Sequence, residues 1–262
     1  MNRIDWVFFD IGNVVFYDLP LLARIWKHFY LTMREAGLSL SYAQLLDERE
    51  AILHANPPEV NPRKLIAEQN AAHVPDEVKQ RAYKYYHLYP GANVPLPGVH
   101  EMLSELARDH KLGVIANQPG LVRAELDQFG LTKYFSELVI SDEVGLHKPD
   151  ERIFKYALDK TGAKPWRCVM VGDRVDNDVR PAKLLGMRTV WLDNDYTKMP
   201  YVPLDEYERQ YIASYLRISG VDQAYGDQDA PDARIATLSE LPAAVAGIAS
   251  SPVGNECMEC VS

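Results

Sequence analysis

Acidic side chains follow two short apolar runs of the sequence, at the points where buried strands would end. Asp10 comes directly after the run Trp6-Val7-Phe8-Phe9. A later run at 168–171 leads into a stretch that holds three carboxylates within six residues, among them Asp173 and Asp178. The carboxyl ends of parallel strands form one edge of a sheet, which is where ligands bind. We therefore expect these carboxylates to lie close together at one sheet edge.

Carboxylates gathered in one place repel one another unless a cation lies between them. Oxygen ligands alone suit Mg²⁺, which prefers octahedral oxygen coordination. Lys148 follows another apolar run at 138–140, and its ammonium would offset the charge of a carboxylate nucleophile and of a bound phosphoryl group. A carboxylate, a lysine and a magnesium ion suffice for phosphoryl transfer through an aspartyl-phosphate, because that reaction demands chiefly positioning and charge stabilisation.

The elements that must position these residues alternate between apolar runs and segments with helical spacing. Short continuous apolar runs are typical of strands that are buried on both faces of a sheet. We predict such strands at 6–9, 112–115, 138–140, 168–171 and 189–192. We predict helices between them at 99–110, 121–129, 151–161 and 178–185. This alternation predicts an α/β fold, a Rossmann-like parallel sheet flanked by helices.

Residues 18–92 interrupt this alternation, because they carry helical patterns and no convincing strand. We expect an inserted α-helical domain there, and an α/β core formed by 1–17 and 93–249. A stretch rich in Tyr and Asp at 196–230 is expected to be an insertion within the core. The end of the chain, 250–262, is expected to be a flexible tail.

Composition and charge exclude several classes of protein. The chain has 262 residues, of which 47% are hydrophobic and 25% charged, as in ordinary globular proteins. Its net charge of −9 gives no basic surplus to attract a phosphate backbone, so we expect no nucleic-acid partner. No apolar run approaches the roughly 20 residues that cross a bilayer, so we expect a cytoplasmic protein without membrane contact.

The cysteines are too few and too unevenly placed for a disulfide framework. They are Cys168, Cys257 and Cys260, which suit a reducing compartment. Cys257 and Cys260 form a single C-x-x-C pair with no second pair or nearby histidine to complete a zinc site. We expect no metal or redox role for this pair.

Four motifs in the expected order resemble those of the haloacid dehalogenase-like hydrolases, most of which are magnesium-dependent phosphatases. The motifs are Phe8-Phe9-Asp10-Ile11-Gly12-Asn13-Val14, Val114-Ile115-Ala116-Asn117, His147-Lys148-Pro149-Asp150, and Gly172-Asp173 with Asp178. The resemblance covers roughly 4–16 and 94–193. The helical insertion between these segments matches the position of the α-helical cap of that family.

The resemblance implies a role for each matching residue. Asp10 would be the nucleophile, and Lys148 would hold both the nucleophile and the phosphate. The metal would be bound by Asp10, Asp173 and the backbone carbonyl of Gly12, with Asp178 supporting the metal or its waters. The phosphate-binding residues implied by the resemblance are Asn13, Ala116, Asn117 and Lys148.

Two positions depart from the family pattern. Gly12 stands where phosphatases of the family usually carry a second Asp, the general acid for the leaving group. Proton delivery typically contributes 10²- to 10⁴-fold, so we expect a preference for good leaving groups such as acyl, anomeric or aryl phosphates. Ala116 stands where the family presents Ser or Thr to the phosphate. One phosphate hydrogen bond is lost there unless Asn117 or a backbone N–H replaces it.

Other functions remain open at this point. The same scaffold could bind a phosphate ligand or a protein partner with little or no turnover. A haloacid dehalogenase also uses a nucleophilic Asp without the second Asp, but it needs no metal, and the retention of Asp173 and Asp178 argues against it. The function favoured by the sequence is a Mg²⁺-dependent phosphohydrolase that acts on a small phosphorylated metabolite.

Overall fold

The computed structural model describes residues 3–55, 60–84, 93–198, 201–218, 226 and 229–250. Of the predicted tail 250–262, Ser250 is the last residue of a helix, whereas 251–262, with the Cys257/Cys260 pair, lie outside the described residues. The chain divides into two compact units. The first contains Met1–Val15, Pro95–Asn194 and Tyr225–Ser262, and the second contains Phe16–Val94 and Asp195–Ala224.

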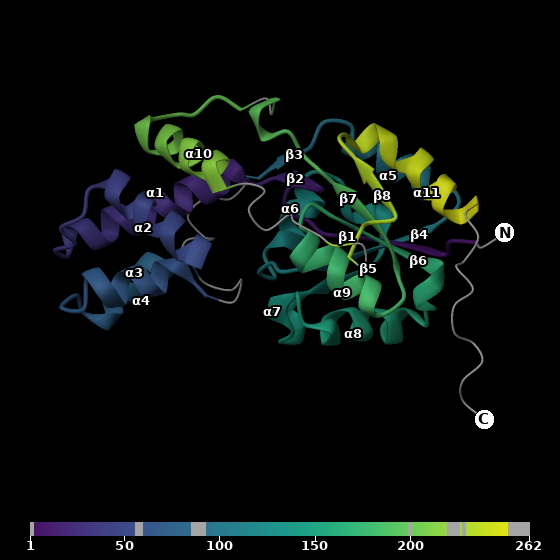
Figure 1. Ribbon diagram of the computed structural model, residues 1–262, viewed down its shortest axis with the longest axis horizontal. Coiled ribbons are helices and arrows are strands. Elements are labelled where there is room, and N and C mark those ends of the chain that lie inside the picture. Colours follow the sequence, from purple (N-terminus) through teal and green to yellow (C-terminus); the bar gives the residue numbers. More distant parts are fainter. Residues whose placement is uncertain are drawn as a thin grey trace. The chain divides into compact units, whose positions relative to one another are not determined.

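The first unit contains a parallel sheet, whose strands among the described residues follow the order β5-β4-β1-β6-β7-β8 (Figure 1). The strands are β1 (Trp6–Phe9), β4 (Lys111–Ala116), β5 (Phe135–Ile140), β6 (Cys168–Gly172), β7 (Arg188–Leu192) and β8 (Ala233–Ile235). Each neighbouring pair runs parallel. The predicted α/β fold with a parallel sheet is therefore confirmed.

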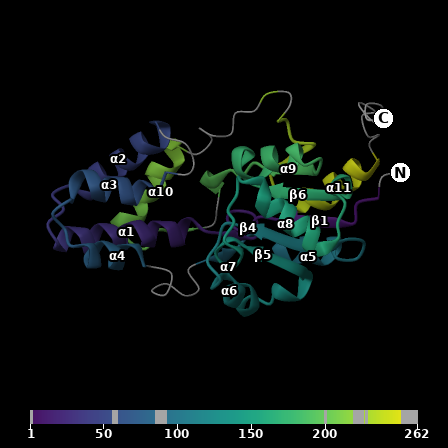
Figure 2. The same ribbon diagram turned by 90° about the horizontal axis from the view of Figure 1, so that it is seen from below.

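Helices cover both faces of the sheet, which explains why its strands are continuous apolar runs. On one face, α8 (Glu151–Thr161) and α9 (Arg180–Leu184) pack against Phe8 and Met170. On the other face, α5 (Val99–Leu106) and α11 (Leu241–Ser250) lie side by side (Figures 1 and 2). The remaining helical elements of this unit are α6 (Val122–Gln128), α7 (Ser141–Val144), 3₁₀ turns at Thr132–Tyr134, Pro165–Arg167 and Leu238–Glu240, and a π-helical turn at Val175–Val179.

The register of β1 against its two neighbours determines where the sheet edge lies. Phe9 is paired with Val114 of β4 and with Val171 of β6. The backbone N–H of Asp10 donates to the carbonyl of Val171 at 2.9 Å, which extends this ladder by one residue. The residues that follow β1, β4 and β6 therefore meet at one edge.

The second unit is helical in its described part and contains α1 (Leu19–Glu35), α2 (Tyr42–Ala55), α3 (Pro62–Asn70), α4 (Asp76–Tyr83) and α10 (Glu206–Ile218) (Figure 2). A 3₁₀ turn, Tyr196–Lys198, precedes α10. Two short strands, β2 (Phe16–Tyr17) and β3 (Val94–Pro95), pair with each other where the chain passes between the units.

The stretch at 196–230 differs from its prediction as an insertion within the core. Residues Asp195–Ala224 group with the helical unit, and α10 packs against α1 and α2. Tyr207 contacts the ring of Tyr30, and Tyr211 stacks on Trp26. Tyrosines four residues apart lie on one face of a helix, so this face of α10 completes the aromatic core of the helical unit.

No helix in the described part of the chain combines the length and the apolar character that a membrane crossing requires.

Candidate active site

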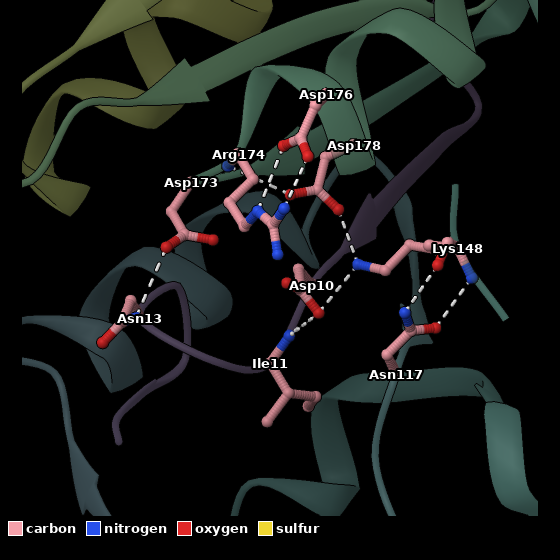
Figure 3. Close-up of polar contacts among 9 residues, drawn as sticks. All are labelled: Asp10, Ile11, Asn13, Asn117, Lys148, Asp173, Arg174, Asp176 and Asp178. Carbon is pink, nitrogen blue, oxygen red and sulfur yellow. Dashed lines mark hydrogen bonds and ion pairs between the residues drawn. The ribbon is translucent and has the colours of Figure 1, made fainter. Parts of the chain in front are cut away.

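Three carboxylates meet at the carboxyl edge of the sheet (Figure 3). Asp10 follows β1, Asp173 follows β6, and Asp178 lies in the π-helical turn Val175–Val179. One oxygen of each carboxylate lies within 4.8 Å of one oxygen of each of the others. All three residues are buried, and Asp178 is completely inaccessible to solvent. The structure thus brings together the three acidic residues that the sequence singled out.

Lys148 places its ammonium between two of these carboxylates. Its Nζ lies 2.9 Å from Asp10 Oδ1 and 2.5 Å from Asp178 Oδ1, and its side chain has no exposed surface. Burial alone would lower the pKa of Lys148, but the charges of Asp10 and Asp178 outweigh burial and raise it above its ordinary value. The amine is therefore charged at neutral pH.

Asp178 uses both carboxylate oxygens within the protein. Oδ1 contacts Lys148, and Oδ2 accepts a hydrogen bond of 3.1 Å from the backbone N–H of Arg174. Burial raises the pKa of Asp178 to about 6 despite the opposing effect of Lys148. A Cβ on Gly172 would lie 2.2 Å from the Cβ of Asp178, so this close approach requires glycine at position 172.

The turn after β1 carries the other residues of the first motif. The backbone N–H of Ile11 donates to Asp10 Oδ1 at 2.7 Å, and Gly12 is buried in this turn. Asn13 has a positive φ of 52°, a conformation that asparagine tolerates better than most residues. Its Nδ2 lies 3.4 Å from Asp173 Oδ2, whereas its buried Oδ1 has no hydrogen-bond partner among the described residues. Asn13 thus contacts a carboxylate of the acidic group.

The second motif lies at the end of β4. Ala116 is the last residue of that strand and offers no side-chain hydrogen bond. The side-chain amide of Asn117, which we expected near the phosphate, instead bonds to the backbone of Lys148. Its Nδ2 donates to the Lys148 carbonyl at 2.8 Å, and its Oδ1 accepts from the Lys148 N–H at 2.7 Å.

Two residues that lie between Asp173 and Asp178, Arg174 and Asp176, form an ion pair beside the acidic group. The guanidinium of Arg174 bonds to both oxygens of Asp176, at 3.1 and 2.5 Å. Burial would lower the pKa of Arg174, but Asp176 and the neighbouring carboxylates raise it. Arg174 is the extended residue that precedes the π-helical turn, and a spacing of two residues does not bring side chains together on a regular helix, so the helical pattern of the sequence did not indicate this pair.

The donor set and the charge of the group fit a divalent metal ion. All three acidic residues offer oxygen, the ligand atom that hard cations prefer. The Lys148 ammonium pairs with Asp10 and Asp178, and the guanidinium of Arg174 pairs with Asp176. A divalent cation would neutralise this group, which is otherwise costly to bury.

Comparison with known proteins places the chain in a family. The model of the haloacid dehalogenase-like hydrolases matches residues 30–192, which is more than half of the chain. The chain belongs to the haloacid dehalogenase-like hydrolase family. The resemblance seen in the sequence motifs is therefore confirmed, and the match includes Lys148, Asp173 and Asp178.

Relatives of this haloacid dehalogenase-like hydrolase carry the names of phosphatases. Glyceraldehyde 3-phosphate phosphatase of Methanocaldococcus jannaschii is 30% identical over 201 residues, 71% of this chain and 84% of the relative. Pyrimidine 5′-nucleotidase YjjG of Escherichia coli (strain K12) is 38% identical over 108 residues, 40% of this chain and about half (48%) of the relative. The crystal structure of a HAD phosphatase from Thermococcus onnurineus shares the fold, with a TM-score of 0.62 and 23% identity, covering 93% of this chain and 98% of that one.

Proposed function

We propose that this protein is a Mg²⁺-dependent phosphohydrolase that acts on a small phosphorylated metabolite through an aspartyl-phosphate. The observation that supports this function best is the position of the Lys148 ammonium, 2.9 Å from Asp10 within a buried group of three carboxylates. The names of the relatives, which are phosphatases of small molecules, point to the same reaction. We also propose that the helical unit is the cap of this enzyme and selects its substrate.

In this mechanism Asp10 attacks phosphorus in line with the leaving group, and water then hydrolyses the aspartyl-phosphate. The Ile11 N–H and the Lys148 ammonium hold the attacking carboxylate, and Lys148 also offsets the charge of the phosphoryl group. Mg²⁺ held by Asp10, Asp173 and the Gly12 carbonyl, with Asp178 in support, would neutralise the phosphoryl oxygens. Asp178 also helps to position Lys148, because its Oδ1 contacts the ammonium while its Oδ2 accepts from the backbone N–H of Arg174.

The residues around Asp10 favour substrates whose leaving group needs no proton. Gly12 has no acidic side chain, and the amide of Asn117 is committed to the Lys148 backbone. Acyl, anomeric and aryl phosphates leave readily without a general acid, whereas alkyl phosphates do not. The same departures favour the second candidate function, a protein that binds a phosphate ligand without efficient turnover.

Hydrolysis of p-nitrophenyl phosphate with Mg²⁺ and with EDTA tests this proposal. We expect turnover that requires Mg²⁺, is lost in Asp10→Asn, and exceeds that of simple alkyl phosphates by roughly 10²-fold or more. Asp127→Asn, which changes an exposed carboxylate of α6, is the matched control and should keep full activity. Phosphate binding without turnover would support the second candidate, and metal-independent release of halide from a 2-haloacid would contradict the phosphohydrolase.

A further inference from the structure

The backbone of Lys148 is held by a side chain that is 31 residues away in the sequence. The amide group of Asn117 meets both the N–H and the C=O of Lys148, at 2.7 and 2.8 Å (Figure 3). Asn117 directly follows β4, so its backbone is fixed by the central part of the sheet. This pair of hydrogen bonds therefore joins the loop that carries the lysine to the sheet edge that carries Asp10.

The loop from Gly145 to Asp150 has only local backbone hydrogen bonds among the described residues. They run from Gly145 N to Ser141 O, from Asp150 N to His147 O and from Ile153 N to Asp150 O, while the side chain of Leu146 packs against the core. The main chain of Lys148 makes no other hydrogen bond in the described part of the chain. Pro149 has no N–H, so it cannot supply a second attachment.

We propose that Asn117 is a positioning residue, which fixes the Lys148 ammonium between Asp10 and Asp178. Asparagine fits this task because its side chain presents one donor and one acceptor in a plane, and so can bond to the N–H and C=O of one residue. Asn117 is itself exposed, whereas Lys148 is buried. Removing the amide takes both of these partners from the Lys148 backbone, and the loop is then free to shift toward water. The ammonium, which needs short contacts to two carboxylates, moves with the loop.

The catalytic consequence rests on the proposed phosphohydrolase function. A misplacement of about 1 Å in a catalytic group can lower a rate 10²-fold, so we expect kcat of Asn117→Ala to fall by roughly 10- to 10²-fold. Asn117→Leu keeps nearly the same shape but has no hydrogen-bonding groups, and its kcat should fall as far. If the side chain of Asn117 only filled space, kcat of Asn117→Leu would stay close to that of the wild type.

A second measurement does not depend on activity. Acylation of lysines, followed by peptide mass spectrometry, reports the accessibility of each ammonium. Lys148 has no exposed side-chain surface and should react slowly in the wild type. We expect its acylation to speed up by roughly 10- to 10²-fold in Asn117→Ala and Asn117→Leu, the scale expected when a buried polar group loses its partner. Lys183, whose side chain is 26% exposed, should react equally in all variants.

Gln118→Ala is the matched control for folding and labelling. Gln118 is the next residue, and its backbone carbonyl, not its side chain, accepts the bonds from Ser141 and Asp142. The Gln118→Ala variant should leave Lys148 protected from acylation. Unchanged protection of Lys148 in both Asn117 variants would overturn this inference, even if the wild type is an active phosphatase. Absence of phosphatase activity in the wild type would overturn the proposed function and leave the labelling result to decide the role of Asn117.

Discussion

Lys148 governs the electrostatics of the acidic group, because it is the cation that directly contacts Asp10 and Asp178 within the described residues. A buried ion pair gains little over an apolar replacement of the whole pair, but removal of one partner leaves a buried charge without compensation. The two carboxylates around Lys148 would both be left in this state. The lysine is therefore expected to matter for folding as well as for chemistry.

Lys148→Met should lose activity and lower the free energy of unfolding by about 3–5 kcal/mol at pH 7 without metal. Burial already raises the pKa of Asp178 to about 6, and loss of the ammonium raises it further. A carboxyl whose pKa is raised in the folded state stabilises the fold at low pH and loses this contribution as the pH rises. The difference in free energy of unfolding between the wild type and Lys148→Met, measured by urea unfolding in EDTA, should therefore be smaller at pH 5 than at pH 7.

The control for this variant is Lys155→Met. Lys155 forms an exposed pair with Glu151 in α8, so its loss should cost less than about 1 kcal/mol at either pH. If instead the loss in free energy of unfolding caused by Lys148→Met grows as the pH falls, then Asp10 and Asp178 are not the groups whose charge the lysine compensates.

The segment between β6 and α9 carries two of the three site carboxylates, Asp173 and Asp178. The helical spacing predicted a helix from Asp178 onward, whereas the structure has a π-helical turn at Val175–Val179 before α9. π-Helical turns are rare and frequently occur at functional sites. The turn buries Asp178 directly against Gly172, which has no side chain to prevent the approach.

Gly172→Ala should displace Asp178 and destabilise the protein by about 1–3 kcal/mol, as overpacking of a close contact does. Activity should fall as well, because Lys148 then loses one of its two carboxylate contacts. Gly247→Ala, within α11, is the control. A Cβ at Gly247 meets no atom within 4 Å, and alanine in a helix is favoured over glycine by about 1 kcal/mol, so this variant should be slightly stabilised. Thermal unfolding and kcat of the two variants check both statements.

The predicted and observed elements agree where packing alone decides the structure. The run predicted at 168–171 became β6 (Cys168–Gly172), and the helix predicted at 121–129 became α6 (Val122–Gln128). Apolar periodicity does not specify which distant group a polar side chain will meet, so the contact of Asn117 with the Lys148 backbone could not be predicted. Nor does the tyrosine spacing of α10 indicate which helices will cover its aromatic face.

At the scale of the whole molecule, the acidic group places three carboxylates close together in the interior of a protein whose net charge is already −9. Repulsion among buried carboxylates opposes folding, and a bound divalent cation reverses this effect. Metal binding by these three side chains, as proposed above, would therefore be coupled to folding stability.

Asp173→Asn should make this coupling visible in calorimetry. In EDTA the variant should unfold at a higher temperature than the wild type, because it removes one of three mutually repelling charges. With Mg²⁺ at 100 times its dissociation constant the wild type should gain about 2.7 kcal/mol, whereas the variant should gain much less. The order of the two melting temperatures should therefore reverse between EDTA and Mg²⁺, while Asp127→Asn should follow the wild type in both.

Two outcomes would contradict this prediction. Equal stabilisation of wild type and Asp173→Asn by Mg²⁺ would place the metal away from this carboxylate. A wild type that melts at a higher temperature than Asp173→Asn in EDTA would mean that the carboxylates are compensated without a cation.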